Sequence, residues 1–139
     1  MILDFHKQFK RKIQSGLKIH TIRKDEFNQW QEGMTIQFTT GAKTEQHHEF
    51  KKAICTNIEP IIIDADKDLI IIGGRILDYT EMLLFVEKDG FDNLKAFFKF
   101  FAFYYPQIPF TGKLIHWTKN AHYGFLDKLP WETTQQLIF

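Results

Sequence analysis

Cysteine is nearly absent from this chain, which has Cys55 as its only one in 139 residues. A single thiol can form no intramolecular disulfide, and it cannot supply a zinc site built from several cysteines. This usage fits a reducing compartment. Cys55 alternates with Ala53 and Asn57 in a strand-like run, so we expect a free thiol in the core.

Long apolar runs are also lacking. The longest one, residues 96–105, is interrupted by Lys99 and is too short to span a bilayer. The first five residues already include Asp4, which is not the pattern of a signal peptide. We therefore expect a cytoplasmic protein that does not bind membranes.

The common motifs of metal and phosphate binding are missing. Gly73-Gly74 is not followed by the Gly-Lys-Ser/Thr of a phosphate-binding loop. His47 and His48 are adjacent, so in an extended segment they face opposite ways, and no cysteine or close second histidine joins them. No Ser-His-Asp arrangement can be read from the chain, and we predict neither a metal site nor a bound cofactor.

Neither sign of charge dominates, and the net charge of +1 argues against a strongly basic nucleic-acid-binding protein. The charge is nevertheless uneven along the chain. Residues 1–24 hold seven lysines and arginines against Asp4, a net charge of +6, and the other 115 residues carry −5. Lys10 and Arg11 belong to this basic segment, which could meet RNA or a phosphate. The alternative is a solvated helix face without a ligand.

Apolar residues recur with helical spacing in two parts of the chain. Phe5, Phe9 and Ile13 lie four residues apart and predict an amphipathic N-terminal helix, which Gly16 can end in a left-handed conformation. In the middle of the chain, a central pair of helices is predicted over 80–87 and from a cap at Asp92 to about residue 104.

The remaining segments read mainly as strands, at 19–23, 34–40, 50–63, 69–72 and 111–118. The third of them is long, and we expect it to bend near Pro60. Strands that are interrupted by one N-terminal helix and one helical pair predict an α+β protein with a small, strongly curved mixed sheet. We assign residues 1–118 to this domain and 119–139 to a C-terminal extension that docks on it, with a helix starting at Pro130.

The second helix of the central pair, with residues 94–105, is apolar nearly all round, and Lys95 and Lys99 form its clearest solvent-facing stripe. A helix of this kind is either buried on most sides or part of a protein interface. We favour burial in the core, and the alternative is a homodimer through this helix.

The segment Gly16-Leu17-Lys18-Ile19-His20-Thr21-Ile22-Arg23 concentrates the reactive side chains. A lysine amine becomes a base or nucleophile when burial or neighbouring positive charge lowers its pKa, and a threonine hydroxyl attacks only when a base takes its proton. We interpret the segment as a hydrogen-bonding patch that faces anions. The alternative is a half-exposed strand whose polar residues face water.

Four short motifs occur in order along the chain: Gly-x-Lys-x-x-Thr-Ile-Arg at 16–23, Trp30-x-x-Gly33 with the β-run 34–38, Asp89-Gly90-Phe91 before a helix, and the closing strand 113–117. In this order and spacing they resemble the ASCH domain family, a branch of the PUA-like superfold, over roughly residues 1–118. The resemblance implies a PUA-like pseudobarrel with the N-terminal helix and the central helical pair at its flank.

The resemblance implies one of two functions. The first is a module that binds RNA or a nucleotide-like small ligand in a basic cleft around Lys18, Thr21 and Arg23. The second is an amidohydrolase that acts on acylated pyrimidine nucleosides of the N4-acetylcytidine type, or, with less support, a ribonuclease that uses the same cleft. The fold alone does not decide between them. We favour binding, because the overall charge is nearly neutral and because the catalytic acid is shortened.

In family members that hydrolyse N4-acetylcytidine, a lysine, a threonine and a glutamate are regarded as catalytic. The first two correspond to Lys18 and Thr21, and the glutamate falls near Asp89, which is one methylene shorter. A displacement of about 1 Å can lower a rate about a hundredfold. Glu87 is the alternative catalytic acid. If Asp89 has no catalytic role, it is simply a polar residue in a turn between two helices.

A regular strand would separate Lys18 from Thr21, because successive side chains alternate between the two faces. The two converge only if Lys18 lies in the turn after Gly16 or if a bulge intervenes.

Four further residues are candidates for ligand binding. Arg23 can hold a phosphate or carboxylate with two parallel hydrogen bonds. His20, if protonated, adds positive charge beside Lys18. Trp30 either stacks on a base or plugs the end of a small barrel. His116, in the last strand, either lines the cleft or is a satisfied histidine of the core.

Overall fold

The computed structural model describes residues 1–125, and their architecture is α+β, as the sequence predicts. The elements follow in the order β1 (Ile2–Phe5), α1 (Lys7–Gln14), β2 (His20–Arg23), β3 (Thr35–Thr40), β4 (His48–Ile54), β5 (Asn57–Asp64), β6 (Leu69–Ile72), β7 (Arg75–Ile76), α2 (Tyr79–Lys88), α3 (Leu94–Tyr104) and β8 (Phe110–His116). The predicted helix start at Pro130 lies outside the described residues.

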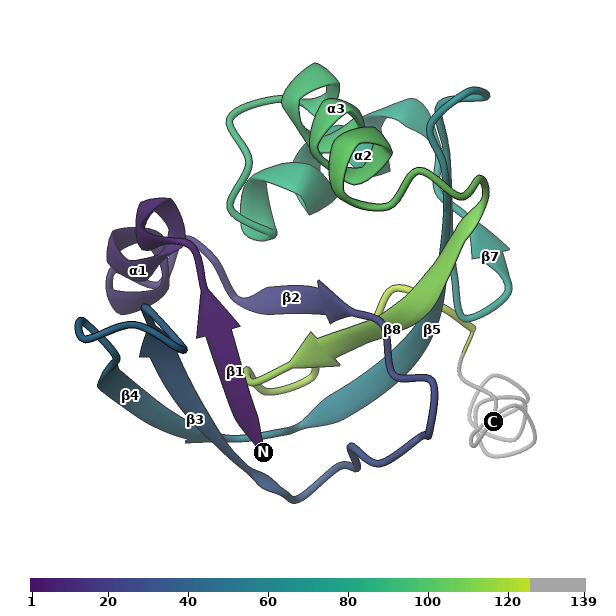
Figure 1. Ribbon diagram of the computed structural model, residues 1–139. Coiled ribbons are helices and arrows are strands. Elements are labelled where there is room, and N and C mark those ends of the chain that lie inside the picture. The colour runs from purple at the N-terminus through teal and green to yellow at the C-terminus, as the bar shows by residue number, and fades with distance from the viewer. Residues whose placement is uncertain (126–139) are drawn as a thin grey trace, which may run out of the picture.

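The strands of residues 1–125 form two open sheets (Figure 1). In the three-stranded sheet, β1 pairs parallel with β3, and β3 pairs antiparallel with β4. The five-stranded sheet has the order β2-β8-β5-β6-β7, and all its pairs are antiparallel. Strand pairing closes neither sheet into a barrel within this part of the chain.

The chain passes from one sheet to the other between β4 and β5, so the predicted single strand over 50–63 is wrong. The backbone N–H of Cys55 donates to Met34, just before β3, at 2.8 Å. The next N–H, of Thr56, donates to His116 in β8 at 2.9 Å. Two consecutive residues therefore bond to different sheets, and the change of direction falls here rather than near Pro60. Cys55 is a buried free thiol, as expected.

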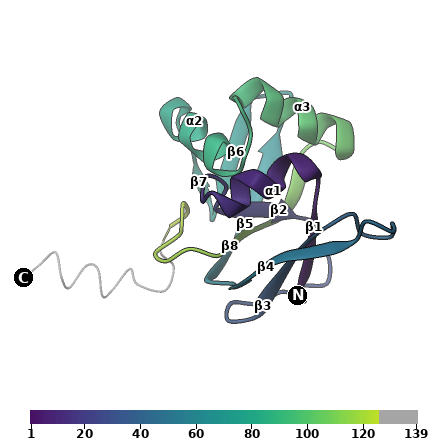
Figure 2. The same ribbon diagram turned by 90° about the vertical axis from the view of Figure 1, so that its left-hand side faces the viewer.

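The elements follow a simple order from one end of the molecule to the other. Figures 1 and 2 show α2 and α3 together at one end, β3 and β4 at the other, and α1 and β2 between them. Phe9 and Ile13 form the buried face of α1, as predicted. Phe5 does not belong to this helix but to β1, where it and Leu3 point to the same side of the strand, toward the core. No helix within residues 1–125 is long and apolar enough to cross a bilayer.

The Phe-rich helix α3 is mainly a core element. Phe97, Phe98 and Phe101 are buried, whereas Phe103 is 76% exposed and Tyr104 is 49% exposed. The buried rings pack against one another and against neighbouring aromatics, for example Phe97 with Phe91 at 5.2 Å between centroids. One face of α3 thus closes the core on the side of the molecule that holds the site described below.

The N-terminal cap of α3 is Asn93 and not Asp92, which the sequence predicted. Asn93 Oδ1 accepts a hydrogen bond from the N–H of Ala96 at 2.8 Å, whereas the Asp92 carboxylate pairs with Lys12 at 2.9 Å. We expect Asn93→Ala to lower the free energy of unfolding by about 1 kcal/mol, because an N–H of the first turn loses its partner. Asp92→Ala is the matched control and should cost about half as much or less, because its ion pair is exposed. Urea unfolding measures both, and equal losses would contradict this assignment of the cap.

Candidate functional site

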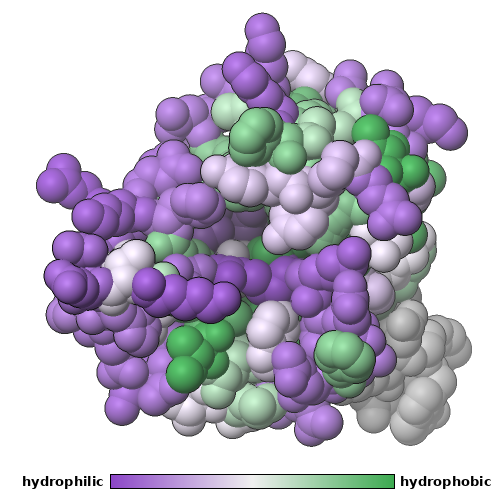
Figure 3. Space-filling model, viewed as in Figure 1, coloured by the Kyte–Doolittle hydropathy of each residue, from purple (hydrophilic) through white to green (hydrophobic). Residues whose placement is uncertain are grey.

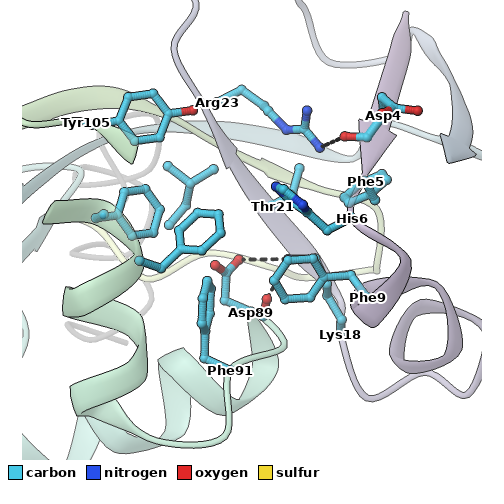
Figure 4. A pocket seen from close by; sticks show the side chains of 13 residues that line it. Asp4, Phe5, His6, Phe9, Lys18, Thr21, Arg23, Asp89, Phe91 and Tyr105 are labelled. Atoms are coloured by element: carbon cyan, nitrogen blue, oxygen red, sulfur yellow. Dashed lines mark hydrogen bonds and ion pairs between the residues drawn. The ribbon is translucent and has the colours of Figure 1, made fainter. Parts of the chain in front are cut away.

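A cavity of about 110 Å³ opens between β1, β2, the turn after α2 and α3. Its polar lining comes from Lys18, Thr21, Arg23 and Asp89, as well as Asp4 and His6. Aromatic rings form the rest of the wall: Phe5, Phe9, Phe91, Phe100, Phe101 and Tyr105. Figure 3 shows this face of the molecule hollowed between its upper, helical part and the strands below, and Figure 4 shows the lining from close by.

Lys18 reaches the cavity from the turn before β2, which begins only at His20. Gly16 adopts a φ of +83°, and the N–H of Lys18 then donates back to Lys12 at 2.9 Å. Because Lys18 precedes the strand, strand alternation does not separate it from Thr21, and both side chains line the same cavity. The turn after Gly16 is the first of the two arrangements that the sequence left open.

The Lys18 amine is buried, with 2% of the residue exposed. It donates to the backbone carbonyl of Asp89 at 2.5 Å, lies 3.4 Å from Asp89 Oδ1, and lies 4.9 Å from the centroid of the Phe9 ring. Burial lowers the pKa of Lys18 to about 8, and the charges of Arg23 and Lys12 act in the same direction, whereas Asp89 opposes the shift. Roughly a tenth of Lys18 is therefore neutral at pH 7.

Asp89 ends α2, and the turn that follows is built to receive two lysines. Gly90 has a φ of +96°, and the N–H groups of Gly90 and Phe91 donate back into the last turn of α2. Lys12 donates to the carbonyl of Gly90 at 2.7 Å, and Lys18 to that of Asp89. Ammonium groups are favourable here because the C-terminal end of a helix carries partial negative charge. Glu87, the alternative acid, is exposed and does not line the cavity.

Thr21 and Arg23 lie two residues apart on β2 and therefore point to the same side of the strand. The Thr21 hydroxyl has no hydrogen-bond partner among residues 1–125 and lines the cavity. Arg23 Nη2 donates to the carbonyl of Asp4 at 2.7 Å, and its guanidinium lies 4.7 Å from the centroid of the Phe5 ring. Desolvation lowers the pKa of Arg23, but a guanidinium stays protonated near neutral pH. It adds a fixed positive charge to the cavity wall.

His20 lies behind the cavity and not in its lining. Its Nδ1 is 2.9 Å from Asp89 Oδ1, and its Nε2 is 2.8 Å from the hydroxyl of Tyr123. Burial lowers the pKa of His20 to about 4, although Asp89 acts to raise it. His20 is therefore neutral near pH 7 and does not supply the positive charge that a protonated His20 would add beside Lys18.

Four other predicted ligand-binding residues lie outside the cavity. Trp30 is half-buried and packs against the core, and His116 is buried with its Nε2 2.8 Å from Glu59. Arg11 is exposed on α1, and the Lys10 amine lies 5.6 Å from the centroid of the Phe50 ring. The structure thus separates the basic face of α1 from the site around Lys18.

The sequence did not predict that the aromatic wall and Tyr123 belong to the site. The wall had a signal in the sequence, because aromatic residues are unusually dense between Phe91 and Tyr105. That density predicted burial in the core or a homodimer interface, and part of it does face the core. Tyr123 carried no such signal, because it reaches His20 over 103 positions of sequence.

Comparison with models of protein families, with curated proteins and with solved structures finds no match for this chain. Geometry and chemistry therefore define the candidate site. Within residues 1–125, no group of three or more histidine, cysteine, aspartate or glutamate side chains is placed to hold a metal ion.

Gly90 permits the close packing beneath the Lys18 amine. A Cβ on Gly90 would meet Lys18 Cδ and Phe9 Cδ1, both at 2.9 Å. Gly16 is a matched control, since its φ is also positive but a Cβ there would meet nothing within 4 Å. We expect Gly16→Ala to lower the free energy of unfolding by about 1–2 kcal/mol through backbone strain. Gly90→Ala should cost about 1–3 kcal/mol more through overpacking. Chemical unfolding measures both, and a Gly90→Ala loss no larger than that of Gly16→Ala would contradict this packing.

Proposed function

We propose that this chain is an amidohydrolase that removes the acyl group from N-acylated pyrimidine nucleosides of the N4-acetylcytidine type. The observation that carries the proposal is the convergence of Lys18, Thr21 and Asp89 on one cavity, with the pKa of Lys18 lowered to about 8. Membership of the ASCH family and a PUA-like pseudobarrel, formed by the two sheets together, are part of the same proposal. The shortened acid was one reason to favour binding, but the Asp89 carboxylate lines the cavity and its Oδ1 lies 3.4 Å from the Lys18 amine without a further methylene.

The size and walls of the cavity support a single-ring ligand. Its volume of about 110 Å³ is close to that of an engineered cavity of about 150 Å³ that binds benzene. Phe9, Phe91, Phe100 and Tyr105 offer aromatic surface to a planar base. The polar groups at the base of this wall would then meet the acylated amine of a pyrimidine.

Lys18 is the general base of the proposed reaction. A neutral lysine amine has two N–H groups, and Asp89 offers an acceptor to each through its carbonyl and Oδ1. The lone pair is then free to take the proton of the Thr21 hydroxyl, whose oxygen attacks the acyl carbon. Arg23 places positive charge where the carbonyl oxygen becomes negative.

The proton on Lys18 then passes to the nitrogen of the leaving amine as the C–N bond breaks. Water next hydrolyses the ester on Thr21, with Lys18 acting again as base. The sum is amide plus water giving a carboxylic acid plus the free amine of the pyrimidine. Asp89 Oδ2 accepts no hydrogen bond within residues 1–125 and faces the substrate N–H in this scheme.

A second candidate function is binding of RNA, and the uneven charge favours it. Arg11 and Lys7 are exposed on α1, within a segment of net charge +6. RNA held there would contact α1 rather than the cavity, and its affinity would fall steeply with salt. The cavity itself offers less to a phosphate, because Arg23 and Lys18 already bond to backbone carbonyls.

Replacement of Lys18 tests the proposal. We expect wild-type protein to hydrolyse N4-acetylcytidine with a kcat/KM that rises with pH and levels off above about pH 8, because the base must be deprotonated. Lys18→Met keeps an unbranched buried side chain and should lower kcat/KM by about 10²- to 10⁴-fold at every pH. Lys18→Arg should fail as well, because a guanidinium does not accept a proton.

Lys7→Met is the matched control, since Lys7 is an exposed lysine on α1. It should hydrolyse the nucleoside like wild type. Chromatographic assay of released cytidine between pH 6 and 9 makes the measurement. Saturable binding of N4-acetylcytidine without any hydrolysis, or equal rates for wild type and Lys18→Met, would contradict the proposed enzymatic activity. A binding function would then be the remaining proposal.

A further inference from the structure

Among residues 1–125, the Asp89 carboxylate is held through one of its two oxygens. Both contacts go to Oδ1, from His20 Nδ1 at 2.9 Å and from the Lys18 amine at 3.4 Å. The contact from His20 is much the shorter, so the orientation of the carboxylate depends mainly on the imidazole. With Oδ1 held in this way, Oδ2 is the oxygen left for the cavity.

His20 is placed to hold this carboxylate and to do nothing else in the cavity. It is fully buried, it stacks on Phe85 with ring centroids 5.0 Å apart, and its ring meets His116 edge-on at 5.4 Å. A neutral imidazole carries one N–H, so it can donate to Asp89 only as the Nδ1–H tautomer. In that tautomer Nε2 is an acceptor and needs a donor.

Tyr123 supplies that donor from the segment after β8. Its hydroxyl lies 2.8 Å from His20 Nε2, and burial together with the charges of Asp89 and Glu59 raises its pKa, so the hydroxyl keeps its proton. The backbone around Tyr123 is fixed in turn. Its N–H donates to the Glu59 carboxylate at 3.0 Å, and its carbonyl accepts from Arg75 Nε.

We propose that His20 is a positioning residue that directs Asp89 toward the cavity, and that Tyr123 sets the tautomer of His20. The catalytic consequence rests on the proposed function, whereas the tautomer does not. The hydrogen bonds from Tyr123 to His20 and from His20 to Asp89 connect a residue that follows β8 to the site. The site therefore needs the part of the C-terminal extension that contains Tyr123. The groups that face His20 are Asp89, Lys18, His116 and Tyr123, together with the apolar ring of Phe85.

Nitrogen-15 NMR of the imidazoles gives the first test. In wild-type protein, His20 should show a protonated Nδ1 and a bare Nε2, with no titration between pH 5 and 8. Tyr123→Phe removes the donor and should shift His20 toward the Nε2–H tautomer. Tyr79→Phe, at an exposed tyrosine on α2, is the control and should change nothing. A wild-type His20 that carries its proton on Nε2, or that titrates near pH 6.5, overturns the proposal.

Kinetics give the second test. His20→Asn keeps an N–H donor near the place of Nδ1, and it should retain most of the wild-type kcat. His20→Leu should lower kcat by about 10- to 100-fold with little change in KM, because the carboxylate loses its orientation. Tyr123→Phe should lower kcat by about tenfold, as one hydrogen bond is lost.

Equal losses in His20→Asn and His20→Leu would show a merely structural histidine and overturn the positioning role. If wild-type protein hydrolyses nothing, the proposed function is wrong, and the NMR experiment still decides how His20 and Tyr123 are arranged.

Discussion

Lys18 crosses from the turn before β2 to the last turn of α2 and places its amine against the backbone carbonyl of Asp89. A buried ammonium is costly unless it is paired, and this one is only partly compensated. Its neighbours are a backbone carbonyl, a carboxylate oxygen at 3.4 Å and two aromatic rings. Desolvation nevertheless lowers its pKa to about 8. The contact joins the end of α2 to the turn before β2, and the burial of the amine at this place makes it a base near neutral pH. The cavity lies where these elements meet.

The groups beneath the cavity continue this pattern of buried polar residues that are neutral or paired. His20 is neutral because burial lowers its pKa to about 4. Glu59, although burial acts to raise its pKa, has a lowered one because His116 and the N–H groups of Tyr123 and Gly124 bond to it. The lowered pKa values of His20 and Lys18 make the stability of the fold depend on pH. The contribution of His20 is present above its unfolded pKa of about 6.5 and is lost as the pH falls toward 4. Lys18 contributes stability that increases as the pH rises from about 8 to 10.5.

The sequence predicted the α+β class and most helices and strands, because these depend on local spacing. It also predicted four of the polar residues that line the cavity, Lys18, Thr21, Arg23 and Asp89, in part through the resemblance to the ASCH family. Phe9 and Ile13 mark a helix face by themselves, and Gly16 marks its end. Errors arose where a tertiary contact overrides a local pattern. Phe5 fits the helical spacing, but pairing with β3 makes it a strand residue. The apolar run 50–63 reads as one strand, yet Cys55 and Thr56 bond to different sheets. The sequence left the protonation of His20 open, and its burial beside Phe85 makes it neutral. The link to Tyr123 depends on how the chain returns after β8, which no local pattern shows.

The central claim is that the Lys18 amine is buried and titrates as a base near neutral pH, and NMR of its Hε and Cε resonances tests this claim without any substrate. Lysine labelled with carbon-13, with Lys18→Met for assignment, gives the titration of this one side chain between pH 6 and 11. The account predicts a midpoint near 8 for Lys18, well below the ordinary lysine value of about 10.5. A midpoint at or above 10 would mean that Asp89 and the end of α2 stabilise the ammonium fully. Lys18 would then be a structural cation, and the account of the site would be contradicted.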